Sequence, residues 1–276
     1  MTGPVSFKAA CVQLRSSGDV AENIRSTSAL VRDAAGQGAR FIATPENTNI
    51  MAQDNRAKLA ATFDEAHDPS LPAFSALAKE LKVWLLIGSL HIKVSDTRTA
   101  NRSFLFAPDG AVRARYDKIH LFDSTVAAGE SYRESSQVEG GQTCVLADTE
   151  FGLLGMTVCY DLRFPLLYRR LAQKGAFAFT MPSSFTVPTG EAHWQVLMRA
   201  RAIENGAFVI APAQGGLHGN GRKTYGHSLI VGPWGEVLAE AGTEPGVIVA
   251  EIDPQLATAA REKVPSLQHD RDFTGP

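Results

Sequence analysis

Apolar runs alternate with segments of helical periodicity along the chain. In the first half, strand-like runs at 7–14, 41–44 and 84–90 are separated by helical segments at about 19–37 and 72–81. Intervals of this length accommodate crossover helices between parallel strands. The runs are apolar at consecutive positions, as strands covered on both faces are. The pattern therefore predicts a layered α/β architecture.

Two patterns occur twice, in the same order along the chain. A strand that ends in proline appears at 41–45 and 177–182, and a strand–turn–strand pattern appears at 103–112 and 228–237. Proline followed by glycine supplies the turn in both copies of the second pattern. Turns often use the same few residues, which explains the repetition of either pattern alone. Two patterns that repeat in the same order indicate two similar halves of the chain. Because no linker separates them, we expect one domain over residues 1–276.

Charge and hydropathy exclude several classes of partner. The chain has 27 Lys and Arg against 29 Asp and Glu, which gives a net charge of −2 and no basic footprint for nucleic acid. It contains no run of about 18 apolar residues, the length that a membrane span requires. Residues 1–8 lack the charged and apolar regions of a signal peptide. We expect neither nucleic acid nor membrane as a partner.

The three cysteines separate into two kinds. An odd number without a CxxC motif argues against a disulfide framework or a zinc site, and it favours the reducing cytoplasm. Cys11 and Cys144 lie in apolar strand-like runs, so we expect them to be packing residues. Cys159 is followed directly by polar residues. The histidines show no metal-binding spacing, and neither a metal nor another cofactor is expected.

Reactive side chains occur where predicted strands end. Glu46 follows the strand at 41–44, Lys118 lies among apolar neighbours, and Cys159 ends a predicted strand that leads into a helix extending to Gln173. The carboxyl ends of strands are where open α/β sheets place ligand chemistry. A desolvated lysine needs a carboxylate or a developing anion, and a thiol at a strand-to-helix elbow is a candidate nucleophile. Singly, each has a simpler interpretation: a loop acid, a surface lysine and a small buried apolar residue.

Taken together, the three residues resemble a known catalytic set. Glu46 in PEN, Lys118 in YDKIHLFD and Cys159 in VCYDLRFP are similar to the Glu-Lys-Cys triad of the nitrilase superfamily of carbon–nitrogen hydrolases. The spacing of 72 and 41 residues also matches, and the resemblance extends over nearly the whole chain. It implies a four-layer αββα sandwich that assembles into a homodimer or a larger homo-oligomer.

The resemblance also implies roles for these residues. Cys159 attacks the amide carbonyl and forms a thioester, Glu46 serves as general base, and Lys118 with the backbone N–H of Tyr160 stabilises the oxyanion. A second carboxylate of the family falls on Glu134, which would orient Lys118 or the substrate amide. The alternative for Glu134 is a solvated loop acid.

The substrate is expected to be a small-molecule amide. Segments 185–194, 199–205 and 213–218 resemble amidases that act on deaminated glutathione, whose relatives are ω-amidases. The implied reaction cleaves the terminal carboxamide of a 2-oxo acid and releases ammonia. The alternatives are 2-oxoglutaramate as substrate, another amidase or carbamoylase, and a non-catalytic scaffold. Segment 124–131 departs from the relatives, and we expect it to be a loop that lines the pocket and bears on substrate choice.

Three further residues are candidates for substrate binding. Family position indicates that the planar guanidinium of Arg163 binds a substrate carboxylate. The alternative is a structural ion pair of Arg163 with Asp161 or Glu204. Phe185 and Thr189 are candidates for the pocket wall, and Phe185 is equally suited to the core.

Overall fold

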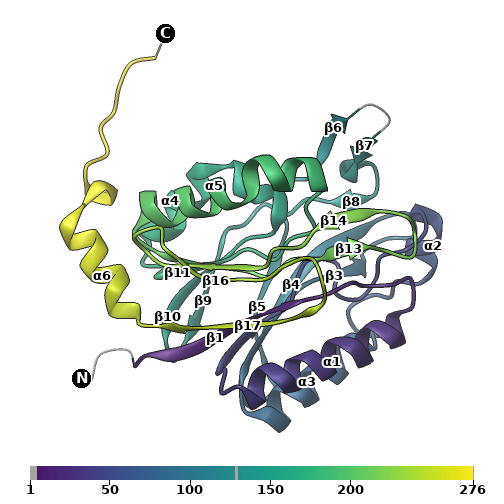
Figure 1. Ribbon diagram of the computed structural model, residues 1–276. Helices are drawn as coiled ribbons and strands as arrows, with labels where there is room; N and C mark the ends of the chain where they lie inside the picture. The colour runs from purple at the N-terminus through teal and green to yellow at the C-terminus, as the bar shows by residue number, and fades with distance from the viewer. Residues whose placement is uncertain (1–4, 128–129, 276) are drawn as a thin grey trace.

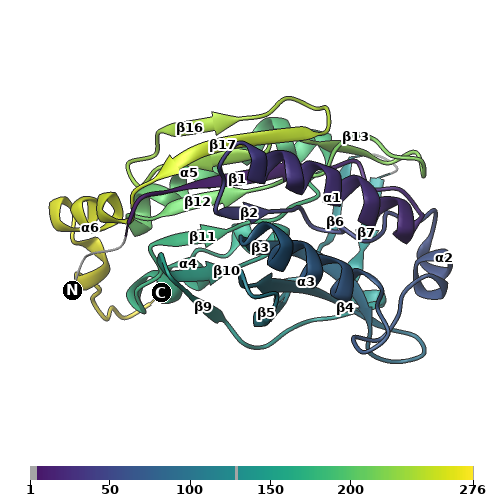
Figure 2. The same cartoon turned by 90° about the horizontal axis from the view of Figure 1, so that it is seen from below.

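The computed structural model describes residues 5–127 and 130–275, which form four stacked layers. Helices α1 (Val20–Gly36) and α3 (Ser70–Leu81) cover the outer face of one central sheet. Helices α4 (Pro165–Gln173) and α5 (Val187–Asn205) cover the outer face of the other (Figures 1 and 2). This arrangement confirms the predicted αββα sandwich.

The first sheet has the strand order β17-β1-β2-β3-β4-β5, and β8 pairs with β4. Its strands are β1 (Phe7–Gln13), β2 (Phe41–Ala43), β3 (Trp84–Lys93), β4 (Thr99–Phe106), β5 (Val112–Asp117), β8 (Val138–Glu139) and β17 (Gly246–Ile252). The second sheet has the order β16-β15-β12-β11-β10-β9. Its strands are β9 (Val145–Thr149), β10 (Gly152–Met156), β11 (Ala178–Thr180), β12 (Phe208–Ala211), β15 (Leu229–Val231) and β16 (Val237–Glu240).

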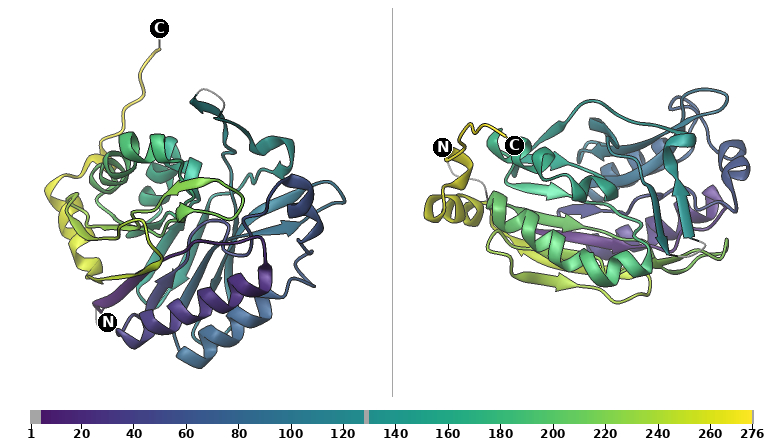
Figure 3. Two further views of the ribbon diagram at one scale, coloured as in Figure 1. Left: turned by 45° about the vertical axis from the view of Figure 1, so that its right-hand side comes forward. Right: turned by 90° about the horizontal axis from the view of Figure 1, so that it is seen from above.

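The smaller elements lie around this sandwich (Figure 3). Two hairpins are formed by β6 (Asp123–Ala127) with β7 (Glu130–Arg133) and by β13 (Gly215–Leu217) with β14 (Lys223–Tyr225). The remaining helical pieces are α2 (Asn55–Ala60), α6 (Pro254–Lys263) and the 3₁₀ turns Glu134–Ser136, Cys159–Arg163 and Ser266–Gln268. Within the described ranges, every helix is too short or too polar to cross a bilayer.

The two sheets repeat one topology, which confirms the two similar halves predicted from the repeated sequence patterns. Strands β1, β2 and β3 are parallel and are followed by antiparallel β4 and β5. Strands β10, β11 and β12 are likewise parallel and are followed by antiparallel β15 and β16. Each set also has an antiparallel neighbour beside its first strand, β17 for β1 and β9 for β10.

The apolar runs reflect burial of the first sheet on both faces. Along β1, Ala9 and Cys11 belong to the core cluster shared with the second sheet, whereas Ala10 and Val12 belong to the cluster shared with α1 and α3. Because successive side chains of a strand point to opposite faces, such a strand must be apolar at every position.

Helix boundaries follow local chemistry and match the predicted ranges to within about two residues. The Asp19 side chain accepts a hydrogen bond from the Glu22 N–H and caps α1. Beyond its other end, Gly38 has a φ of 88°, a conformation that glycine adopts without a steric penalty. Helix α3 ends at Leu81 and is followed by the capping residue Lys82, whose φ is 56°.

One packing prediction and one loop prediction are wrong. Cys11 is buried, but Cys144 is exposed because it precedes β9, the edge strand of the second sheet. Segment 124–131 contributes to the β6–β7 hairpin instead of an irregular loop, because antiparallel pairs such as Ser124 with Tyr132 join its two arms. Residues 128 and 129, part of the Ala-Ala-Gly departure from relatives, lie outside the described residues.

Candidate active site

The topology brings together the three residues singled out by their motifs. Glu46 follows β2, Cys159 follows β10, and Lys118 follows β5. Strand β5 is antiparallel to β4, which is antiparallel to β3, so β5 ends at the same side of the sheet as its parallel strands. The carboxyl ends of strands from both sheets therefore converge on one site.

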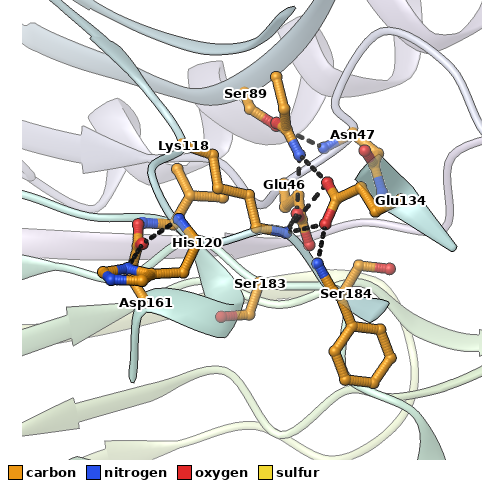
Figure 4. Close-up of polar contacts among 12 residues, drawn as sticks. Glu46, Asn47, Ser89, Lys118, His120, Glu134, Asp161, Ser183 and Ser184 are labelled. Atoms are coloured by element: carbon orange, nitrogen blue, oxygen red, sulfur yellow. Dashed lines mark hydrogen bonds and ion pairs between the residues drawn. The ribbon is translucent and has the colours of Figure 1, made fainter. Parts of the chain in front are cut away.

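A buried lysine lies between two carboxylates at this site (Figure 4). Lys118 Nζ is 2.8 Å from Glu46 Oε1 and 2.9 Å from Glu134 Oε2, and the residue is 2% exposed. Burial by itself would lower the Lys118 pKa, but the charges of Glu134 and Glu46 outweigh it and raise the pKa well above its usual value. Lys118 is therefore a permanent ammonium at neutral pH.

Glu134 is integrated into this cluster and is not a solvated loop acid. It begins the 3₁₀ turn after β7, and its side chain is 15% exposed. Its Oε2 accepts a 2.6 Å hydrogen bond from the Phe122 N–H as well as the contact from Lys118. Burial is the largest single effect and opposes its ionisation, but the Lys118 charge and the hydrogen bonds from Lys118, Phe122 and Asn101 together outweigh burial and lower the Glu134 pKa.

Asn101 completes the cluster and was missed in the sequence. Its Nδ2 donates to Glu46 Oε1 at 2.9 Å and to Glu134 Oε1 at 3.1 Å. Its backbone carbonyl accepts from the Lys118 backbone N–H at 3.0 Å, so the same residue contacts both the Lys118 main chain and the two carboxylates that pair with the ammonium. The available signal was a polar Asn-Arg-Ser triplet at 101–103 before the apolar end of β4.

The turn that carries Glu46 is tied to both sheets. The Asn47 N–H donates to Ser89 Oγ at 3.0 Å from the first sheet. Gln214, which follows β12 in the second sheet, donates from Nε2 to the Glu46 carbonyl at 3.0 Å. These contacts fix the carboxylate relative to the nucleophile that the second sheet supplies.

Cys159 occupies a constrained elbow. It opens the 3₁₀ turn with a φ of 50°, a left-handed conformation that costs a residue with a side chain about 1–2 kcal/mol. Strand β10 ends at Met156, so the prediction of a strand reaching Cys159 is wrong by three residues. The chain nonetheless continues along the second sheet, because the Cys159 N–H donates to the Pro182 carbonyl at 3.0 Å.

The Cys159 thiol is protonated and close to a base. Burial, and then the negative charge of Glu46, raise its pKa above the usual value despite the opposing charge of Lys118. Cys159 and Glu46 line the same cavity. A neutral thiol beside a carboxylate is suited to attack with concurrent proton transfer.

Asp161 joins the cysteine elbow to the lysine segment. It is completely buried and accepts from the Tyr116 hydroxyl at 2.6 Å and from the Val158 N–H at 2.8 Å. It also accepts from the His120 N–H at 3.1 Å, with His120 Nδ1 at 2.7 Å (Figure 4). The two segments that carry Lys118 and Cys159 are thus held by one carboxylate.

A cavity of about 260 Å³ opens onto the cluster, and all eight residues expected at the site line it. They are Glu46, Lys118, Glu134, Cys159, Tyr160, Arg163, Phe185 and Thr189. Ser131, in the segment expected to line the pocket, does so as well. Phe185 belongs to the pocket wall and to the core, as the sequence allowed. It lines the cavity and packs edge-on against Trp194, with ring centroids 5.0 Å apart.

Arg163 does not form either of the structural ion pairs considered for it. Asp161 bonds Tyr116 and His120, and Glu204 pairs with Arg201 at 2.9 Å. Arg163 Nη2 instead lies 3.2 Å from His193 Nδ1, so no carboxylate within the described residues neutralises its guanidinium.

Two further cations of the cavity were missed in the sequence. Lys58 comes from α2 and Arg222 from the loop between β13 and β14, and both line the cavity. No motif marks either one, because they meet only after folding. Nowhere among the described residues do three or more His, Cys, Asp or Glu side chains lie close enough together to hold a metal ion.

Comparison with known proteins relates this chain to one family. Residues 8–262 match the family described as carbon-nitrogen hydrolase. A deaminated glutathione amidase from Synechocystis sp. is 40% identical over 268 residues, 95% of this chain and 97% of that protein. Omega-amidase NIT2 from Homo sapiens is 33% identical over 267 residues, 96% of this chain and 95% of that protein.

Solved structures show the same relationship. Nit3 from Saccharomyces cerevisiae, described as a member of branch 10 of the nitrilase superfamily, superposes with a TM-score of 0.87, at 30% identity over 97% of each chain. The NitFhit protein of C. elegans superposes with a TM-score of 0.91, at 32% identity over 98% of this chain and 66% of that longer one.

Proposed function

This chain belongs to the carbon–nitrogen hydrolase family and hydrolyses amide carbon–nitrogen bonds, and on that premise we propose that Cys159 is its nucleophile and a 2-oxo acid amide its substrate. The observation that carries the proposal is the position of a buried thiol against the Glu46–Lys118–Glu134 charge cluster at the cavity. A scaffold protein gains nothing from burying three charges beside a thiol, since burial of charge is costly.

Acylation begins with proton transfer from the Cys159 thiol to the Glu46 carboxylate. The raised pKa of Cys159 makes this transfer necessary, because little thiolate exists before the substrate binds. The sulfur attacks the carbonyl carbon, and the negative charge moves onto the carbonyl oxygen. The Lys118 ammonium and the Tyr160 N–H stabilise that oxyanion, and each such donor is worth about 2.7–4 kcal/mol in other hydrolases.

Collapse of the tetrahedral adduct breaks the carbon–nitrogen bond. Glu46 returns its proton to the departing nitrogen, and the acyl group remains on Cys159 as a thioester. Water then gives a proton to Glu46 and attacks the thioester carbonyl. Cleavage of the carbon–sulfur bond releases the acid, and the thiol recovers its proton. Glu134 touches Lys118 and acts as its positioning residue throughout.

The relatives suggest two substrates with different leaving groups. Hydrolysis of 2-oxoglutaramate, a primary amide, releases ammonia. The scissile amide of deaminated glutathione joins a 2-oxoglutaryl group to cysteinylglycine, so its hydrolysis releases that dipeptide, and the expectation of ammonia does not apply to it. Both reactions yield 2-oxoglutarate, and Arg163 is the proposed partner of the 2-oxo acid carboxylate, because no carboxylate within the described residues occupies its guanidinium.

A substrate panel tests this function. Formation of 2-oxoglutarate from each amide is measured for the wild type, Cys159→Ala and the control Cys144→Ala, which removes an exposed thiol. We expect Cys159→Ala to lose at least about 10⁴-fold in kcat with its circular dichroism unchanged, and Cys144→Ala to match the wild type. Turnover by Cys159→Ala at a comparable rate, or no turnover of either amide by the wild type, refutes the proposal.

Two broader expectations also remain proposals. We propose a homo-oligomer, supported by the exposed apolar side chains of Val196, Ile203 and Trp234 on or beside α5. A cytoplasmic location is supported by three cysteines that are all unpaired.

A further inference from the structure

A second cavity of about 320 Å³ adjoins the active-site cavity. Both cavities are lined by Asn47, Asn55, Lys58, His91 and Arg222. The second one extends along segment 50–54 and Asn220, whereas Cys159 and Arg163 line only the first. The space thus leads away from the nucleophile, toward α2 and the β13–β14 loop. Ligand pockets commonly measure roughly 300–1,000 Å³, so the two together suit a longer substrate than a primary amide.

Two cations without carboxylate partners lie where the cavities meet. Neither Lys58 nor Arg222 forms an ion pair within 5–127 and 130–275, in contrast to Arg102, which pairs with Glu65 and Asp117. Arg222 Nη2 donates to the Ser184 carbonyl at 2.8 Å, but its buried Nε has no hydrogen-bond partner. A buried donor that is left unpaired costs about 1–3 kcal/mol, which a bound acceptor recovers.

The two charges also repel each other. Burial is the main cause that lowers the Lys58 pKa. The charge of Glu134 opposes it and exceeds the effect of any other single charge, Arg222 and Lys118 lower the pKa further, and Glu46 raises it. An anion placed between Lys58 and Arg222 would relieve this repulsion. The unpartnered Arg222 Nε, and the lack of an ion pair for either cation within the described residues, favour an anionic ligand group at this point.

The subsite is held in place by the fold. Asn220 Nδ2, in the loop that carries Arg222, donates to the Ala52 carbonyl at 2.8 Å in the segment before α2. His218 anchors the same loop through Thr224 Oγ1 at 2.7 Å and the Ser16 carbonyl at 3.0 Å. Because these hydrogen bonds already hold the loop in place, a ligand does not have to order it on binding. The two cations therefore form a preorganised site.

We propose that Lys58 and Arg222 bind a carboxylate carried by the leaving group of the substrate. The enzyme then prefers N-substituted amides of 2-oxo acids whose amine part ends in a carboxylate over primary amides. The acyl part of the substrate lies toward Arg163 in the first cavity, and the amine part extends into the second. This inference rests on the proposed function and specifies its substrate class.

The test compares three substrates that differ beyond the scissile nitrogen: 2-oxoglutaramate, deaminated glutathione, and deaminated glutathione with its C-terminal carboxylate converted to a carboxamide. The kcat/KM for 2-oxoglutarate formation is measured in the wild type, Lys58→Gln, Arg222→Gln and Arg222→Lys. Lys93→Gln is the control, because Lys93 pairs with Asp96 at 3.6 Å and lines neither cavity.

We expect Lys58→Gln to lower kcat/KM for deaminated glutathione, whose C-terminal carboxylate is free, about 10- to 100-fold. The kcat/KM for the other two substrates should change less than about threefold. Arg222→Gln should show the same selective loss, and Arg222→Lys should recover part of the lost kcat/KM for deaminated glutathione. Equal losses on all three substrates, or no loss on any, overturn the subsite. The wild type separates the two proposals: turnover without preference for the carboxylate refutes the subsite alone, whereas no turnover refutes the proposed function. If Arg222→Gln fails to fold, Lys58→Gln decides, since Lys58 is only partly buried and α2 contributes no fully buried residue to the core.

Discussion

Replacement of Glu134 by Gln should separate positioning of Lys118 from simple support of the fold. The carboxylate receives Lys118 Nζ at 2.9 and 3.1 Å, the Phe122 N–H at 2.6 Å and Asn101 Nδ2 at 3.1 Å. A glutamine keeps the shape but turns one acceptor oxygen into a donor, so at least one of these donors faces another donor. Hydrogen bonds to charged groups contribute about 1.5–3 kcal/mol each, and we expect Glu134→Gln to lose about 2–4 kcal/mol of unfolding free energy.

The effect on catalysis follows from the Lys118 ammonium. Without Glu134, Lys118 pairs more tightly with Glu46, which weakens the base and draws the ammonium away from the oxyanion. We expect kcat to fall about 10²-fold with little change in KM, because the lost interaction belongs to the transition state. The Lys118 pKa must also fall, since Glu134 is one of two carboxylates that raise it. Loss of the Lys118 proton at high pH removes the oxyanion donor, so the alkaline limb of the kcat/KM profile should move to lower pH.

The assay is a pH–rate profile together with urea unfolding of the wild type, Glu134→Gln and the control Glu139→Gln, which alters an exposed acid on β8. The control should match the wild type in both measurements. A Glu134→Gln enzyme that loses stability but keeps its kcat and its alkaline limb refutes the positioning role. An unchanged stability refutes the energetic reasoning.

Three further predictions concern the frame of the site. Asp161→Asn should lose about 2–4 kcal/mol in urea unfolding and reduce activity as well, because a fully buried carboxylate with four donors joins the two catalytic segments; unchanged stability would contradict this. Gly88→Ala should lose about 3 kcal/mol or more, since an added Cβ lies 2.0 Å from the Thr44 carbonyl, whereas Gly18→Ala meets open space and should be neutral in the same thermal melts. The folded state lowers the Glu134 pKa, so its ionisation stabilises the protein above the usual value of 4.5 and ceases to do so as pH falls through the lowered value. The stability difference between wild type and Glu134→Gln should therefore narrow as the pH falls below the usual value of 4.5, and a constant difference would show that the charge is not responsible.

The sequence predicted what depends on local pattern and on strand order. The periodicity of α1 and α3 and the two-sided burial of β1 were readable because each element carries its own signal. The Glu46, Lys118 and Cys159 motifs were joined into one site by their resemblance to a known triad, and the strand ends that they follow do meet at one site. The repeated turn patterns indicated the repeated topology for the same reason.

What the sequence could not predict depends on distant segments meeting. Asn101 looks like an ordinary strand residue until β4 aligns it with Lys118, and Lys58 and Arg222 lie far apart along the chain. The left-handed φ of Cys159 occurs where its N–H donates to the Pro182 carbonyl, in a different strand connection. The wrong expectation for Cys144 arose because apolar neighbours do not reveal that a segment precedes an edge strand.

The central claim is that hydrolysis passes through a thioester on Cys159. Acid quenching during turnover of 2-oxoglutaramate, followed by mass spectrometry of the peptides, measures this directly. We predict a 2-oxoglutaryl group on the peptide that contains Cys159, none on those with Cys11 or Cys144, and its release as a hydroxamate by hydroxylamine. Continued turnover with no acyl group on Cys159, together with an active Cys159→Ala enzyme, would contradict the account.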